Sequence, residues 1–403
     1  GPTPNTEVDG LKFDIDGAAG LGLAEQAVSS NTLGSRGSRL ADGSGSSNLL
    51  AVEPDGSMRP AIDVGSVHIE HLQIGPDDKV YAVIATEPGE CILIVIDSDT
   101  GVATCVDDTL MVVDIAEDGT FVQFDEAGGV YYKGYDMDSP MPLIRRNDDG
   151  VITDYVNDNQ WIDDWLVTSD AAIFLRGQTL STSASWLRRV SPTGGLATIV
   201  NGYVPFMHVF PDGNVYFGVH NDPIGVRRFN VAMGSLDPVN YIGPACDDPC
   251  AAPVFAVNDP TPYAENGEWG FTSDGRVFSG TDYATPRQLF PAPLEVATQV
   301  EKTQRLLGLS STLLISGTDA LDRNILTEID PADGTEAVLI DPDVVGEVEV
   351  YHLGYNETEN KVIFDGLRFS DNKYVVGFID PQTGDVVTTP APGGKLVDLQ
   401  AFS

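Results

Sequence analysis

The stretch Val209-Phe210-Pro211-Asp212-Gly213-Asn214-Val215-Tyr216-Phe217 places an acidic tight turn between two apolar runs. Asp and Gly tolerate the positive φ of tight hairpin turns and Pro fixes φ on the approach, so this pattern predicts a β-hairpin. A close copy spans Phe271–Phe278. Related copies surround residues 75–78, 126–129, 169–171, 310–312 and 357–360, so this first kind of hairpin occurs seven times.

A second kind of hairpin follows the first within each repeat. It reads as a strand, an Asp/Pro/Gly turn and another strand, most clearly in Ile94–Ala103, Glu328–Thr335 and Phe378–Asp385. Two hairpins make a four-stranded sheet, and the repeat from Pro76 to Glu357 averages about 47 residues, within the range of propeller blades. Small sheets that bury their faces only against their neighbours form such a ring. We therefore expect an all-β chain folded as a single β-propeller of four-stranded blades.

The two ends of the repeat region are expected to close the ring. A hairpin of the second kind at Leu50–Met58 lacks a first hairpin before it, and Lys395–Phe402 is a lone strand at the other end. Joining them covers strand edges that would otherwise be open. This favours eight blades, with seven as the alternative if the early hairpin only decorates the ring. Residues 17–47 are rich in Gly, Ala and Ser, so residues 1–47 are predicted to be a flexible tether and residues 48–403 the propeller domain.

The four cysteines indicate an oxidising compartment. Cys91 and Cys105 lie in the two strands of one hairpin, while Cys246 and Cys250 enclose a short loop. Locally paired cysteines in even number predict two disulfides, whereas a zinc site would need to join two distant pairs. We expect an exported protein of the periplasm, the outer-membrane surface or the extracellular medium. Any membrane attachment is expected only from a lipid anchor upstream of residue 1.

The formal net charge is −39, which repels nucleic acid and other polyanions and excludes nucleic-acid binding. Such a charge serves either solubility in salt water or attraction of basic partners. Asp97 and Asp99 place two carboxylates in one turn, a spacing that suits a structural calcium ion. The alternative is that these Asp residues stabilise the turn itself.

Arginine pairs recur at one position of three consecutive blades. They are Arg145-Arg146, Arg188-Arg189 and Arg227-Arg228. Adjacent strand residues face opposite sides of a sheet, so each pair is expected to bridge acidic neighbours between blades. A basic ligand groove is the alternative.

Imidazole and aromatic side chains gather on the strands expected to be innermost, near a central channel. In that position they could bind a ligand or a metal, or transfer protons. The alternative is that they are isolated core or channel-lining residues. The residues are His71, His208, His352, Tyr351, Tyr355, Trp165 and Trp269.

The stretches Pro211–Tyr216 and Asp380–Gly384 resemble the blade motifs of bacterial propellers of the TolB, NHL and YVTN types. The resemblance covers most of residues 48–403. These motifs describe turns, so the resemblance implies the fold and leaves the ligand undefined. The sequence also lacks the Gly-x-Ser-x-Gly elbow of esterases and related peptidases.

We expect a non-enzymatic, secreted or surface-tethered binding propeller that acts as a scaffold in protein assembly in the cell envelope. The alternative is a carbohydrate-active enzyme similar to a polysaccharide lyase, which needs a base and cations that neutralise the uronate carboxylate. His208, His352, Tyr351 and Arg227 are the candidates for that chemistry. The net negative charge argues against a polyanionic substrate.

Overall fold

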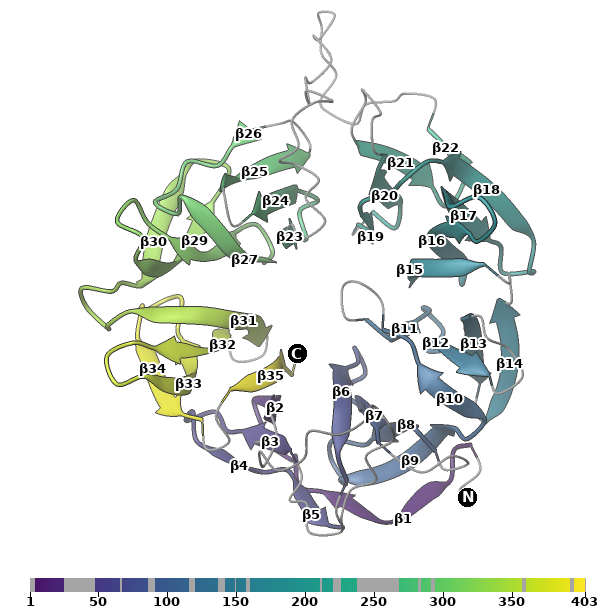
Figure 1. Cartoon of the computed structure of the whole chain (residues 1–403), viewed down its shortest axis with the longest axis horizontal. Coiled ribbons are helices and arrows are strands. Elements are labelled where there is room, and N and C mark those ends of the chain that lie inside the picture. Colours follow the sequence, from purple (N-terminus) through teal and green to yellow (C-terminus); the bar gives the residue numbers. More distant parts are fainter. Residues whose placement is uncertain are drawn as a thin grey trace, which may run out of the picture.

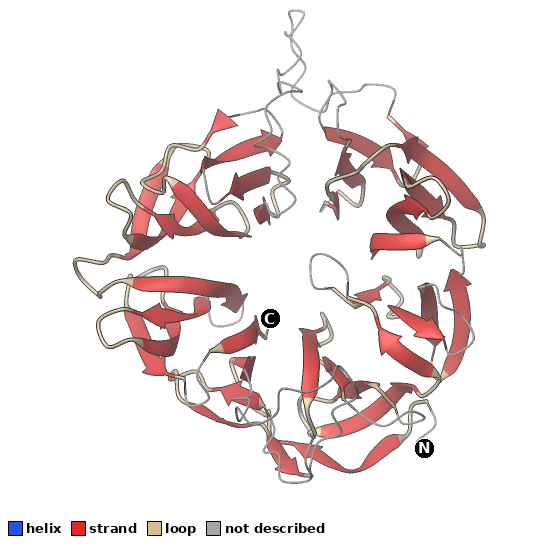
Figure 2. Ribbon diagram, in the orientation of Figure 1, coloured by secondary structure: helices blue, strands red, loops and turns tan. Residues whose placement is uncertain are grey.

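The computed structural model describes residues 4–24, 48–65, 67–85, 91–115, 120–136, 142–148, 150–156, 160–210, 212–219, 226–237, 268–281, 284–290, 294–356, 360–391 and 395–402. These ranges contain thirty-five strands and no helix. The strands form eight sheets arranged in a ring, an eight-bladed β-propeller (Figures 1 and 2). The predicted fold class and the favoured number of blades are confirmed.

Blades 4 to 8 are antiparallel sheets of four consecutive strands. Blade 4 contains β15 (Trp161–Val167), β16 (Ile173–Thr179), β17 (Ala184–Val190) and β18 (Leu196–Asn201); blade 5 contains β19 (Met207–Val209), β20 (Val215–Gly218), β21 (Val226–Asn230) and β22 (Ser235–Leu236). Blade 6 contains β23 (Glu268–Phe271), β24 (Val277–Thr281), β25 (Ala284–Phe290) and β26 (Leu294–Glu295). Blade 7 contains β27 (Lys302–Gly308), β28 (Leu313–Thr318), β29 (Asn324–Asp330) and β30 (Thr335–Ile340); blade 8 contains β31 (Val348–Asn356), β32 (Lys361–Arg368), β33 (Lys373–Ile379) and β34 (Val386–Pro390).

The other three blades depart from this plan. Blade 1 joins β35 (Leu396–Ala401) to β2 (Gly20–Ala24), β3 (Leu49–Val52) and β4 (Met58–Pro60). Blade 2 has six strands, β6 (Ile69–Ile74), β7 (Val80–Ile84), β8 (Leu93–Ile96), β9 (Val102–Asp107), β1 (Glu7–Phe13) and β5 (Ile62–Val64). In blade 3, β10 (Leu110–Val113) and β11 (Val122–Phe124) both pair with β12 (Val130–Asp136), which is followed by β13 (Leu143–Asp148) and β14 (Val151–Val156).

The composite blade 1 confirms that both ends of the chain close the ring, but corrects the predicted tether. Strand β2 pairs with β35 on one side and β3 on the other, and β1 pairs with β9. Residues 7–13 and 20–24 therefore belong to the propeller, while residues 25–47 lie outside the described part of the chain. The glycines read as flexible are instead needed for close packing. A Cβ on Gly20 would lie 2.6 Å from the Gln400 carbonyl oxygen, and one on Gly22 would lie 2.9 Å from Leu396.

The blades are joined by apolar clusters and by hydrogen bonds from side chains to a neighbouring blade. Gln400 Nε2 of blade 1 donates to the Leu72 carbonyl at 2.8 Å, and Gln73 Nε2 of blade 2 donates to the Val122 carbonyl at 2.9 Å. Lys133 Nζ of blade 3 donates to the Ile162 carbonyl at 3.0 Å. Each bond satisfies a buried or half-buried polar group while fixing one blade against the next.

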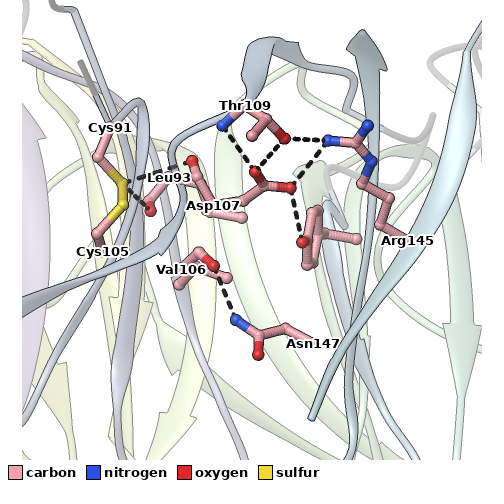
Figure 3. Close-up of a disulfide and its surroundings, with 9 residues drawn as sticks. Cys91, Leu93, Cys105, Val106, Asp107, Thr109, Arg145 and Asn147 are labelled. Atoms are coloured by element: carbon pink, nitrogen blue, oxygen red, sulfur yellow. Dashed lines mark hydrogen bonds and ion pairs between the residues drawn. A yellow bond between two sulfur atoms is a disulfide. The ribbon is translucent and has the colours of Figure 1, made fainter. Parts of the chain in front are cut away.

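One of the two predicted disulfides lies in the described residues. Cys91 and Cys105 are bonded, with sulfur atoms 2.05 Å apart, and both are buried in blade 2 (Figure 3). The predicted pair Cys246 and Cys250 lies outside the described residues. Two residues after Cys105, the buried Asp107 contacts Arg145 of blade 3, with Nη1 and Oδ2 3.1 Å apart. This contact confirms that an arginine of the repeated pairs bridges neighbouring blades.

Candidate functional site

A β-bulge recurs near the start of the inner strand in five blades. In four blades the register of the inner strand shifts just before one residue, and these residues are His71, Asp164, Arg305 and His352. In β35 the shift likewise falls just before Asp398. Each of these five residues is paired directly with the second strand of its blade. Equivalent register positions of repeated blades lie at the same height in the ring, so the bulges bring these side chains to one level. Two of the three predicted inner histidines, His71 and His352, belong to this level.

In blades 7 and 8, glycine in the second strand makes room for the bulge. A Cβ on Gly317 would lie 1.9 Å from the Lys302 carbonyl oxygen, and one on Gly366 would lie 2.2 Å from that of Glu349. These contacts are far shorter than a real side chain allows. In these two blades the glycine therefore permits the close approach of the bulged inner strand.

In blades 4, 7 and 8, the residue after the bulge is bonded within the ring. Asp164 Oδ2 lies 3.0 Å from Arg176 Nε, and both side chains are buried. Arg305 Nε donates to the Tyr351 carbonyl at 2.6 Å. In blade 8, His352 Nδ1 lies 2.6 Å from Oδ1 of a buried carboxylate, that of Asp365.

Blades 1 and 2 differ because the paired residue on the second strand is apolar. Asp398 is opposite Leu23, and His71 is opposite Val83. Burial raises the pKa of Asp398, while the nearby His352 and His71 imidazoles lower it to a lesser degree. The order of the blades, 8, 1 and 2, thus places His352, Asp398 and His71 in a row with the carboxylate in the middle.

A cavity of about 590 Å³ opens beside this row, between β6 and β35. Glu70 is the extra residue of the β6 bulge, and it lines the cavity together with the next residue, His71. The next three residues of the same strand, Leu72, Gln73 and Ile74, line the cavity as well. Its polar lining residues are Glu70, His71, Gln73, Thr120, Asp398 and Gln400.

The remaining catalytic candidates lie elsewhere. His208 in blade 5 stacks on Phe271 of blade 6, with ring centroids 3.9 Å apart, and burial lowers its pKa to about 4. Arg227 is on β21, the third strand of its blade, paired opposite Phe217, and is not on an inner strand. His208 and Arg227 therefore belong to blade 5, whereas His352 belongs to blade 8.

The predicted aromatic residues have different environments. Tyr351 is the extra residue of the β31 bulge, and burial together with Glu349 raises its pKa to about 12. The Tyr355 hydroxyl donates to Asn360 in the following turn. Trp165 is 1% exposed in an apolar cluster, so it is a core residue. Trp269 lies on the inner strand β23, and its side chain is outside the described part of the structure.

The predicted calcium ligands serve the backbone of their turn. Asp97 Oδ1 accepts hydrogen bonds from Thr100 N at 2.9 Å and Thr100 Oγ1 at 2.7 Å, and these bonds lower the pKa of Asp97. Asp99 is exposed at the tip. Within the described ranges, no group of three or more His, Cys, Asp or Glu side chains is arranged to hold a metal ion.

Sequence reasoning missed Asp365 and Asp398, the two carboxylates that flank His352. A signal for Asp365 was present, because a polar residue followed by Gly interrupts the apolar second strand in several blades. The copies are Lys133-Gly134, Arg176-Gly177, Ser316-Gly317 and Asp365-Gly366. All four polar side chains are buried. Asp398 is in the strand expected to close the ring, but its sequence alone does not reveal the two neighbouring imidazoles.

A group of exposed apolar side chains lies on the face where the inner strands begin. We call Leu321, Val344, Val345 and Phe369 the rim patch; their exposed fractions are 70%, 78%, 38% and 47%. They lie on three loops, β28–β29, β30–β31 and β32–β33. The loops are in contact, because Arg323 Nη1 is 2.9 Å from Asp343 Oδ2 and Phe369 N donates to the Glu347 carbonyl at 3.0 Å.

Comparisons with known proteins found distant structural similarity. No protein-family model and no curated protein sequence matches the chain. Among solved structures, a eukaryotic initiation factor is similar with a TM-score of 0.49 and 9% identity, over 94% of this chain and 97% of that one. Puromycin hydrolase has a TM-score of 0.46 and 11% identity, over 79% of this chain but only 54% of that one. TolB from Acinetobacter baumannii has a TM-score of 0.34 and 10% identity, over 84% and 82%.

Proposed function

We propose that this chain is a non-enzymatic binding propeller that holds a partner protein on the rim patch and acts as a scaffold in protein assembly in the cell envelope. The rim patch is the observation that carries the proposal. Exposed apolar groups gathered on one face of a soluble protein are candidates for an interaction surface. Here four of them lie on loops that contact one another at one face of the ring.

The chemistry of the partner follows from charge. A molecule with a net charge of −39 attracts basic proteins from a distance and repels acidic ones. The proposed partner therefore presents an apolar segment flanked by Lys or Arg. An exported location is supported by the Cys91–Cys105 disulfide, since disulfides persist in oxidising compartments.

A polysaccharide lyase is the second candidate, favoured by one observation. The buried Asp365 holds Nδ1 of His352, an arrangement that orients an imidazole for use as a general base. The separation of His208 and Arg227 from this site weakens the candidate, as does Asp398 beside His352. Incubation with polyuronates, followed by the absorbance of unsaturated uronates, tests it directly. Product formation that His352→Ala abolishes in a folded chain would establish the lyase and overturn the scaffold proposal.

The binding proposal is tested by substitutions on opposite faces of the ring. Leu321→Ser and Phe369→Ser change the rim patch, while Met233→Ser changes an equally exposed residue on the β21–β22 turn at the other face. A partner is first purified with the intact propeller from an envelope fraction, and its stoichiometry is established by native mass spectrometry. The rim variants should weaken this defined complex by about tenfold each, because each removes about 1.4 kcal/mol of apolar contact. Equal binding by all three variants would exclude the rim patch.

A further inference from the structure

We propose that the cavity between β6 and β35 binds a primary ammonium group, a lysine side chain or an N-terminal amine, presented by the partner protein. This inference rests on the proposed function and names the group that a partner would insert beside the inner strands. The site consists of Glu70 and His71 from β6 and Asp398 and Gln400 from β35, around about 590 Å³ of space.

Both strands that line the cavity carry a β-bulge. The shift in β6 falls immediately before His71 and the shift between β2 and β35 falls immediately before Asp398, and both residues line the cavity. Bulges occur preferentially where a strand must re-aim a side chain, often beside a binding site. Two neighbouring blades thus place a bulge beside the cavity.

Equivalent positions around the ring differ in the partner that they meet. Asp164 in blade 4 is neutralised by Arg176, and His352 in blade 8 is bonded to Asp365. Asp398 occupies the same level, but its opposite residue is Leu23, which carries no charge. A half-buried carboxylate beside an apolar partner gains most from an added cation, because the cation offsets the loss of hydration.

The geometry of the acceptors favours an ammonium group over the other cations. A guanidinium carries its donors in one plane and matches a single carboxylate edge, whereas an ammonium has three diverging N–H donors. The carboxylates of Asp398 and Glu70 line the cavity from two strands, while the Gln400 amide is bonded to Asp398, Leu72 and Ile74. A metal ion is disfavoured because the described residues contain no three-ligand group of His, Cys, Asp or Glu.

Asp398 predicts the pH dependence of binding. The groups that face Asp398 are Gln400 on its own strand, Glu70 and His71 on β6, and His352 on β31, which is itself bonded to Asp365. Burial raises the pKa of Asp398, so its carboxylate becomes protonated at a higher pH than that of an exposed Asp. A protonated Asp398 no longer attracts an ammonium ligand, so binding should weaken as the pH falls from 7.5 to 5.

The probe for this site is Nα-acetyl-lysine methylamide, with its Nε-acetylated form as the uncharged control. Binding is followed by isothermal calorimetry and by NMR signals of the histidine imidazoles. Asp398→Asn should weaken binding by about tenfold, the effect of losing one favourable charge contact of about 1.4 kcal/mol. Asn is close in shape to a protonated Asp, so the variant retains the packing of the strand. Asp385→Asn, at an exposed turn of blade 8, is the matched control and should bind like the parent chain.

Equal binding of the acetylated probe, no effect of Asp398→Asn, or binding that is unchanged between pH 7.5 and 5 would each overturn the ammonium site. The two proposals fail separately. Loss of the partner complex in Leu321→Ser with unchanged binding of the lysine probe supports both sites. A normal partner complex in Asp398→Asn would remove the cavity from partner recognition while leaving the rim patch in place.

Discussion

His208 shows how a packing contact fixes the charge of a single residue. Its ring is stacked on Phe271, and burial lowers its pKa from the ordinary 6.5 to about 4. Between these two pH values the unfolded chain binds a proton that the folded chain does not. Stability from this residue is therefore complete above about pH 6.5 and is lost as the pH falls toward 4.

His208→Phe should reduce this pH dependence while preserving the ring stack. Between pH 7 and pH 4, the parent chain should lose up to about 3 kcal/mol more unfolding free energy than the His208→Phe variant. This figure follows from about 1.36 kcal/mol for each unit of pKa shift. Denaturant titrations of both chains across this range measure it. All other groups titrate in both chains, so an equal dependence of stability on pH in the two chains would show that His208 is not held neutral in the folded state.

Arg145 illustrates the cost of removing one partner from a buried pair. It contacts Asp107, which is fully buried, and Asp107 also accepts hydrogen bonds from Tyr132 at 2.8 Å and Thr109 (Figure 3). Arg145→Ala leaves the Asp107 charge without its cation, so we expect a loss of about 3 kcal/mol or more in unfolding free energy. Arg368→Ala, which breaks an exposed pair with Asp371, should cost less than about 1 kcal/mol. Equal losses in chemical denaturation would contradict a structural role for the Arg145–Asp107 contact.

At the level of the strand, the bulge and the glycine opposite it form one unit. Gly317→Ala would place a Cβ 1.9 Å from the Lys302 carbonyl oxygen, so β27 and β28 must separate. Overpacking of this kind costs about 1–3 kcal/mol, seen as a lower midpoint of thermal unfolding. Gly195→Ala is the control, because its new Cβ would meet only Ser191 Oγ at 3.1 Å on an exposed turn. A thermally unaffected Gly317→Ala would refute the close approach of the two strands.

The strands also show how far the sequence could be interpreted. Turn chemistry predicted the hairpins well, since Asp, Pro and Gly report local backbone geometry. The sequence of β2 was misread as part of a flexible tether. Glycine occurs both in flexible segments and where strands pack closely, and the sequence alone does not distinguish the two roles. The strand reads Gly20-Leu21-Gly22-Leu23-Ala24. The candidate site was predicted only in part, for a similar reason. His71 and His352 were placed correctly on inner strands, but Asp398 acquires its neighbours from a pairing between opposite ends of the chain.

The whole ring depends on that pairing between the ends of the chain. In blade 1, β2 lies between β35 and β3, so it connects the last strand of the chain to the early hairpin. Its five residues are all buried, and Asn356 of blade 8 also donates to the Ala19 carbonyl just before it. Removal of β2 would expose the edges of two strands and separate blade 8 from blade 2.

A chain that begins at residue 25 should therefore lose the closed ring, whereas a chain that lacks only residues 1–3 should behave like the parent. Closed propellers bury each blade between two neighbours, so the open form should unfold at lower temperature and with less cooperativity, and should associate through its free edges. Calorimetry measures the first two effects and light scattering the third. Identical melting of the two shortened chains would instead return residues 1–24 to the role of a tether, and would imply that β35 and β3 close the ring without β2.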